Sequence, residues 1–171
     1  MSSARCDSLP PKAPSAVAAV ALVLGSGKLV PVPIGVGPGY QPSPALHGTC
    51  RVAPLRAGAR VHVELFANRR VVIVPAAIGV RGRCRAHVWT TAPTGVVRFD
   101  RAETLGGLFR IWGEPLGPRR LLSFRGPVRL YRNGVRVRTG SRGMRLRAGD
   151  ELVLEVGGYV PPHSSYLFPP D

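Results

Sequence analysis

The chain has 171 residues, in which 24 Lys and Arg residues outnumber 9 Asp and Glu residues and give a formal charge of +15. Its 44% of hydrophobic residues can form a core, which excludes a fully disordered protein. No stretch reaches the roughly 18 to 20 uninterrupted apolar residues that cross a bilayer, so a polytopic membrane protein is excluded as well.

Residues 1–27 have the order of an export signal, with basic Arg5 and Lys12 followed by an apolar run and then small residues. A signal of this kind predicts an extracytoplasmic or secreted protein, and the cytoplasm is expected if the segment is not a signal. Proline and glycine recur through residues 28–59, which is typical of an extended linker or arm.

Alternating apolar residues predict a β-hairpin with strands over 60–66 and 70–74. A third strand is predicted over 84–90 and a fourth over 94–100, with the turn-forming Ala92-Pro93 between them. The alternation predicts that the first part of the domain is built from strands.

One helix is predicted, over residues 105–112. Its apolar residues recur at helical spacing, Thr104 can cap its start, and Gly113 followed by Pro115 ends it. The apolar stripe must pack against another element, and a sheet is the expected partner.

A second hairpin is predicted from strands over 127–131 and 135–138, because Asn133-Gly134 favours a type I′ turn. A last strand is predicted over 151–156. The fold class predicted for the domain, residues 60–158, is therefore strand-rich α+β, with one helix packed on a mixed sheet. An all-β sandwich is the alternative.

The segment 94–158 resembles the β-grasp fold of ubiquitin-like and sulfur-carrier proteins, because a strand leads into a helix, Asn-Gly follows, and Gly-Asp-Glu opens the last strand. Sulfur carriers end in a free Gly-Gly. Here Gly157-Gly158 is followed by the segment 159–171, so carrier chemistry is not expected.

Six sequence blocks occur in a fixed order along the chain: His62 to Asn68, Val74 to Gly79, Pro93 to Val97, Thr104 to Gly106, Trp112 to Leu116, and Gly158 to His163. In this order they resemble a family of small, uncharacterised, exported bacterial proteins. Some members of that family carry Leu-His-Thr-His-Asp where this chain has Val88 to Ala92, so those histidines are missing here. The resemblance implies export and brings no known activity.

Cys50 and Cys84 flank the first predicted strand pair, which favours a disulfide between them over the alternative of two free thiols. Cys6 lies in the possible signal segment. The chain has no Cys-x-x-Cys pair, so neither a zinc knuckle nor a thioredoxin-like redox pair is indicated.

The basic residues crowd the C-terminal half of the chain. They indicate a basic face for a polyanion, because guanidinium groups match phosphate and carboxylate bidentately; the alternative is an ordinary solvated surface. The predicted face consists of Arg119, Arg120, Arg125, Arg129, Arg132, Arg136, Arg138, Arg142, Arg145 and Arg147.

His62 and Glu64 share a face of their predicted strand, and with His87 they are the candidate metal ligands. No catalytic residue and no cofactor is predicted, because no nucleophile–base arrangement or phosphate loop is recognisable.

The C-terminal segment, residues 159–171, is rich in proline and aromatic residues. It is expected to be extended, either as a strap along its own domain or as an arm for a partner. The candidate arm residues are Tyr159, Pro161, Pro162, Tyr166 and Phe168.

Together these features favour a non-enzymatic binding or structural module outside the cytoplasm, with a protein partner or self-assembly. The alternatives are a protein that binds an acidic polymer or nucleic acid, and a degenerate metal-binding protein. The ligand, the oligomeric state, the start site and the fate of Cys6 are left open by the sequence.

Overall fold

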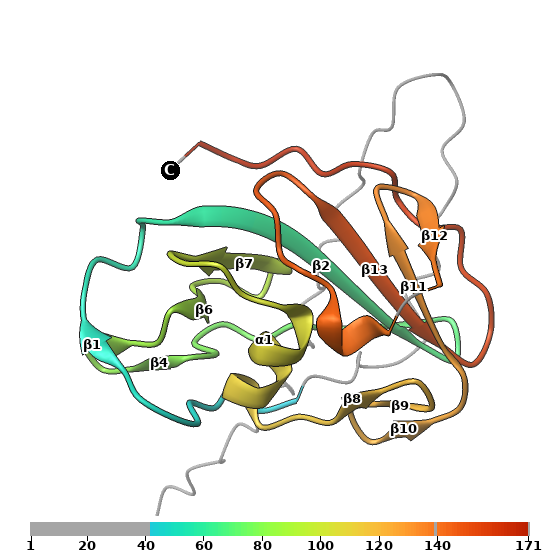
Figure 1. Ribbon diagram of the computed structural model, residues 1–171, viewed down its shortest axis with the longest axis horizontal. Coiled ribbons are helices and arrows are strands. Elements are labelled where there is room, and N and C mark those ends of the chain that lie inside the picture. Colours follow the sequence, from blue (N-terminus) through green and yellow to red (C-terminus); the bar gives the residue numbers. More distant parts are fainter. Residues whose placement is uncertain (1–41, 139, 171) are drawn as a thin grey trace, which may run out of the picture. The chain divides into compact units, whose positions relative to one another are not determined.

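The computed structural model describes residues 42–138 and 140–170, and its largest element is a mixed sheet (Figure 1). The strands follow the order β12-β11-β13-β2-β7-β6, and β3 adds to β2. All neighbours are antiparallel except β13 and β2, the parallel pair at the centre. The strands are β2 (Ala59–Ala67), β3 (Arg70–Val72), β6 (Val88–Thr90), β7 (Val96–Phe99), β11 (Val128–Arg132), β12 (Val135–Val137) and β13 (Glu151–Val156).

Two small three-stranded sheets are formed by short strands that, apart from β1, lie between strands of the main sheet in the sequence. The first has the order β1-β5-β4, from β1 (Arg51–Val52), β4 (Val80–Arg81) and β5 (Cys84–Arg85). The second has the order β10-β9-β8, from β8 (Leu116–Gly117), β9 (Arg120–Leu121) and β10 (Phe124–Arg125).

The helix α1 (Leu105–Trp112) packs against one face of the main sheet (Figure 1). Thr104 caps it, since its hydroxyl accepts a hydrogen bond from the N–H of Gly107, and Gly113 ends it in the left-handed conformation at φ 79°. A short 3₁₀ helix, η1 (Ser141–Gly143), follows β12. The main core lies under α1 and includes Val61, Val63, Leu65, Leu105, Leu108, Phe109, Trp112, Leu152 and Leu154.

The opposite face of the sheet, which we call the outer face, is covered by the extended residues 157–170, which we call the C-terminal strap. A second, smaller apolar cluster lies there and joins Phe66, Tyr131 and Val153 of the sheet to Val160 of the strap. The strap therefore gives the outer face its own buried layer.

The predicted strand-rich α+β class is confirmed, and the helix spans the predicted residues 105–112. The β-grasp arrangement and the all-β alternative are not established. The predicted strand 84–90 is in fact two short strands, β5 and β6, that belong to different sheets. No helix in the described part of the chain has the length and apolar character needed to cross a membrane.

The segment 42–58 packs on the domain, although it falls within the predicted linker. The indole N–H of Trp112 donates to the carbonyl of Ser43, the N–H of His47 donates to the carbonyl of Ile111, and Leu46 contacts the main core. The possible signal, residues 1–27, lies outside the described residues.

Candidate functional site

A histidine and two glutamates meet on the outer face of the sheet. His62 and Glu64 are alternate residues of β2, so their side chains point to the same face. Glu151 begins β13, and the parallel register pairs it with His62. One possible ligand atom from each of these three residues lies within 4.8 Å of the others. We call this group the outer-face cluster.

Both ring nitrogens of His62 have partners. Nε2 lies 2.8 Å from the carbonyl oxygen of Thr94, and Nδ1 lies 2.7 Å from Oε2 of Glu151. A carbonyl oxygen only accepts hydrogen bonds, so Nε2 carries a proton and donates it. The contact between Nδ1 and the carboxyl group then needs a second proton, held by either side chain.

A glycine allows the backbone to reach His62. Gly95 has φ 79°, and a β-carbon on it would lie 2.6 Å from the carbonyl oxygen of Val63 and 2.8 Å from Nε2 of His62. Only glycine combines this backbone conformation with so close an approach. Gly95 therefore holds the Thr94 carbonyl in position to accept from the imidazole.

Glu151 is completely buried at 0% exposure. Burial raises the pKa of its carboxyl group, and the hydrogen bond with His62 opposes this only in part. Its Oε1 has no hydrogen-bond partner among the described residues. A buried carboxylate oxygen without a donor or cation is energetically unfavourable, so this atom calls for a physical explanation.

The C-terminal strap closes over the cluster. Nδ1 of His163 lies 2.8 and 2.9 Å from the two carboxylate oxygens of Glu64, and this hydrogen bond raises the pKa of His163, while burial opposes the rise. The ring of Tyr166 stacks on His62 with centroids 3.7 Å apart. Phe168 lies edge-on to Tyr166 and under the guanidinium group of Arg60. The cluster is thus shielded by aromatic rings.

A third glutamate anchors the strap further along β13. Glu155 is fully buried, and its carboxylate accepts from Nε of Arg129 at 3.0 Å and from the N–H of Val160 at 3.1 Å. Unlike Glu151, it has a partner on each oxygen. On the same face of the sheet, one buried glutamate therefore has a hydrogen-bond donor for each oxygen and the other does not.

The structure places the predicted arm residues along the chain's own sheet. Tyr166 and Phe168 take part in the ring contacts with His62 and Arg60, whereas Tyr159 is 57% exposed. Pro161 is exposed and Pro162 is half-buried. The strap alternative therefore describes the arrangement, and use of these residues by a partner stays a prediction.

Two of the three candidate metal ligands, His62 and Glu64, lie together in the structure, whereas His87 lies elsewhere. It precedes β6 and contacts Glu103 near the start of α1, while Nη2 of Arg101 lies 2.9 Å from its Nδ1. Sequence reasoning missed two members of this group: Glu151, the first residue of the predicted strand 151–156, and His163 of the C-terminal segment. Only the parallel pairing of β13 with β2 brings Glu151 to His62.

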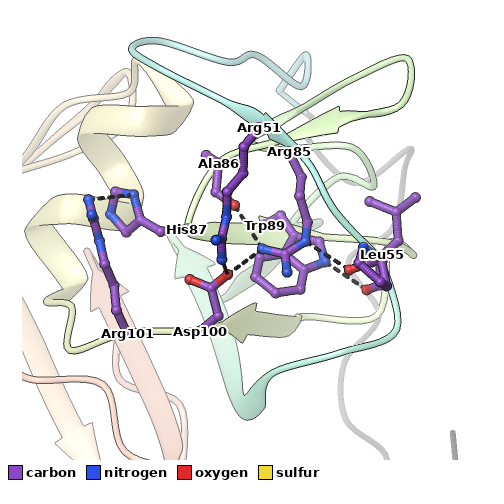
Figure 2. A network of polar contacts seen from close by, with 9 residues as sticks. Arg51, Leu55, Arg85, Ala86, His87, Trp89, Asp100 and Arg101 are labelled. Carbon is purple, nitrogen blue, oxygen red and sulfur yellow. Dashed lines mark hydrogen bonds and ion pairs between the residues drawn. The ribbon is translucent and has the colours of Figure 1, made fainter.

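A second polar network holds residues 51–55 against β6 and β7 (Figure 2). Asp100 accepts from Arg51 at 2.5 Å and from Arg85 at 2.6 Å. The buried guanidinium group of Arg85 also lies 3.6 Å from the centre of the Trp89 ring, and the indole N–H donates to the carbonyl of Leu55 (Figure 2). These are structural contacts, since the side chains are saturated by one another.

The predicted disulfide between Cys50 and Cys84 is present, with Cα atoms 5.5 Å apart. It lies beside the pairing of β1 with β5, where Val52 faces Cys84. The bond and the arginine network therefore fasten the same segment to the domain.

Acidic and basic side chains are segregated by depth. None of the seven acidic residues in the described ranges is exposed, and six of them pair with an arginine or a histidine. Glu114, the seventh, is half-buried, and burial raises its pKa. The exposed charges are the guanidinium groups of Arg51, Arg56, Arg69, Arg70, Arg81, Arg83, Arg101, Arg110, Arg119, Arg120, Arg125, Arg136, Arg138, Arg142, Arg145 and Arg147.

The ten predicted basic-face residues do not share one strand face. Arg129 and Arg132 are three apart on β11 and point to opposite sides, where they pair with Glu155 and Asp150. The other eight are exposed. Two of them, Arg120 and Arg142, line a hollow of about 370 Å³ together with Arg110 and Glu114.

No protein-family model, curated protein or solved structure matches this chain.

Proposed function

We propose that this protein is a non-enzymatic, extracytoplasmic module that binds a phosphate-bearing polymer through its arginine-covered surface. The observation that carries the proposal is the segregation of charge: the described acidic side chains are buried or half-buried, and the exposed charges are arginines. The described surface therefore carries many more exposed positive groups than negative ones. Such a surface attracts polyanions and gains from the release of their counterions.

Arginine suits phosphate better than lysine does, because its planar fork can donate two parallel hydrogen bonds to one phosphate group. The hollow lined by Arg110, Arg120 and Arg142 brings guanidinium groups from α1, β9 and η1 to one place. We propose this hollow as the centre of the binding surface, with the other exposed arginines extending the contact along the polymer.

The extracytoplasmic location is supported by the disulfide between Cys50 and Cys84, since such bonds persist in oxidising compartments. We retain the β-grasp-like arrangement as the proposed fold type. Its support is the central parallel pair of β2 and β13 together with α1, the one α-helix among the described residues.

The test measures binding of the disulfide-intact chain to polyphosphate, to a single-stranded DNA oligonucleotide and to polyglutamate over a series of salt concentrations. We expect the two phosphate polymers to bind more tightly than polyglutamate, and log Kd to vary linearly with log salt. The absence of salt-dependent binding to either phosphate polymer would refute the proposal.

Two triple variants with equal net charge test the role of the hollow. Arg110→Gln, Arg120→Gln and Arg142→Gln remove its guanidinium groups, whereas Arg56→Gln, Arg70→Gln and Arg83→Gln remove exposed ones elsewhere. We expect the first set to weaken binding at least about tenfold more than the second and to lower the salt slope by about 2. Equal losses would show that only overall charge matters.

Two apolar side chains, one in the strap and one on β12, are largely exposed. Leu167 in the strap is 92% exposed and Val135 on β12 is 70% exposed. We propose self-association through these apolar side chains as the second candidate function. Light scattering should show that the wild type forms a species larger than a monomer. The joint variant Val135→Ser and Leu167→Ser should be monomeric under the same conditions. A wild type that is monomeric at all concentrations would contradict self-association.

A further inference from the structure

We propose that the outer-face cluster, His62, Glu64 and Glu151, together with His163 of the strap, binds one divalent first-row transition-metal ion of the zinc type. Two imidazoles and two carboxylates are a donor set that such ions accept, whereas Mg²⁺ and Ca²⁺ prefer oxygen ligands alone. This site is separate from the arginine surface and does not depend on the polymer-binding proposal.

The framework of the site is rigid. His62 and Glu64 project from β2 and Glu151 from β13, which are the paired central strands of the sheet. Their possible ligand atoms already lie within 4.8 Å of one another. Only side-chain adjustments are needed to bring them to the roughly 2.0–2.2 Å distances of zinc–nitrogen and zinc–oxygen bonds.

His62 is oriented as a metal ligand would be. Its Nε2–H donates to the carbonyl of Thr94, which leaves the lone pair of Nδ1 facing Glu151. Metal-binding histidines usually donate their other ring N–H to a carbonyl or a carboxylate, which fixes both the ring and the tautomer. Here a metal ion replaces the proton that the contact between His62 and Glu151 otherwise requires.

The buried carboxylate of Glu151 is independent support for a bound cation. Its side chain is 0% exposed, and Oε1 has no hydrogen-bond partner within the described ranges. Glu155, the neighbouring buried glutamate on the same strand, is satisfied at both oxygens. A cation in the cluster removes this difference, because it compensates the unpartnered oxygen directly.

The charges balance as well. With both histidines neutral, Glu64 and Glu151 carry two negative charges, which one divalent ion neutralises. His163 already contacts both oxygens of Glu64, so the strap supplies the fourth donor. Tyr166 stacks on His62 and covers one face of its imidazole. Metal binding would therefore also fasten the strap to the sheet.

The test titrates the chelator-stripped, disulfide-intact full chain with Zn²⁺, Mg²⁺ or Ca²⁺ by calorimetry. We expect one Zn²⁺ per chain, no comparable binding of Mg²⁺ or Ca²⁺, and a higher melting temperature with Zn²⁺. The variants His62→Gln and Glu151→Gln should weaken zinc binding at least about 100-fold, beyond the 10- to 100-fold typical of losing an outer-shell partner.

His87→Gln is the matched control, since it breaks another half-buried histidine–glutamate pair that lies outside the cluster. It should leave zinc affinity unchanged. Absence of zinc binding, or an equal loss in the control and in the cluster variants, overturns the proposal and leaves the cluster as two proton-sharing pairs.

A measurement on the wild-type chain covers the case in which a variant fails to fold. Zn²⁺ should shift the imidazole ¹⁵N resonances of His62 and His163 and leave those of His47 and His87 in place. Shifts confined to His47 or His87 contradict the assignment.

Discussion

The guanidinium group of Arg85 lies over the Trp89 ring, with its central carbon 3.6 Å from the ring centre, while it also donates to Asp100. Arg51 reaches the same carboxylate from the surface: its side chain is 68% exposed and that of Arg85 only 3%. One carboxylate thus has a buried and an exposed partner.

Replacing the two partners should therefore have unequal effects. Arg85→Ala removes a buried cation, its ring contact and its bonds to backbone carbonyls, so we expect it to lower the free energy of unfolding by about 3 kcal/mol or more. Arg51→Ala should lower it by less than about 1 kcal/mol. Urea denaturation of both variants measures the difference, and equal losses would contradict the assigned roles.

Acid should destabilise the protein through Asp100 and Glu103. Burial alone would raise the pKa of each carboxyl group, but hydrogen bonds from Arg85 and Arg51 to Asp100, and from the Thr104 N–H and His87 to Glu103, outweigh it and lower both values. Groups with a lowered folded-state pKa stabilise the fold above their unfolded values of 3.8 and 4.5 and lose that effect as the pH falls through the folded pKa.

Denaturation midpoints between pH 6 and pH 2 measure this loss. Asp100→Asn should be less stable than the wild type at pH 6 and should have a shallower acid slope below the unfolded pKa. A slope unchanged by the substitution would show that Asp100 does not contribute to it.

The disulfide should contribute about 2–5 kcal/mol, because it closes a loop of 34 residues in the unfolded chain. The joint variant Cys50→Ser and Cys84→Ser should show this loss in urea. Under reducing conditions the wild type should approach the variant. If reductant leaves the wild-type midpoint where it is, the bond does not stabilise this domain.

Alanine substitutions at two neighbouring strap residues should change the free energy of unfolding by very different amounts. Tyr166→Ala removes the ring stacked on His62 and should lower the free energy of unfolding by about 1–3 kcal/mol. Leu167→Ala changes a side chain that is 92% exposed and should stay within about 0.5 kcal/mol of the wild type. Thermal melts of both variants decide whether the strap is docked in solution as the structure has it.

Two glycines with nearly equal φ separate backbone strain from steric overlap. Gly95 has φ 79° and no room for a β-carbon, whereas Gly149 has φ 80° and nothing within 4 Å. Gly149→Ala should lose about 1 kcal/mol from backbone conformation alone. Gly95→Ala should lose clearly more and should shift the His62 ring resonances, and similar losses would refute a tight fit at Gly95.

Local signals predicted the local elements well. The helix 105–112 follows from Thr104, Gly113 and an apolar stripe, and the β11–β12 hairpin from Asn133-Gly134. The two-residue strands β1, β4, β8, β9 and β10 were missed, since segments that short carry no periodicity. Elements whose start, end or turn is specified by neighbouring residues in the sequence could therefore be predicted.

The outer-face cluster could be predicted only in half, because it depends on a pairing across 89 residues. Strand alternation places His62 and Glu64 on one face, but no residue near Glu151 in the sequence indicates that β13 pairs in parallel with β2. A hydrophilic Asp-Glu pair after Ala-Gly is typical of a turn, and burial of its glutamate is a tertiary effect. His163 was likewise hidden in a proline-rich tail.

The place of β13 between β2 and β11 also has a consequence for synthesis. Until residues 151–156 have left the ribosome, β11 and β12 cannot join the part of the main sheet built on β2. A chain interrupted before residue 151 would therefore expose the edges of two incomplete sheets to aggregation.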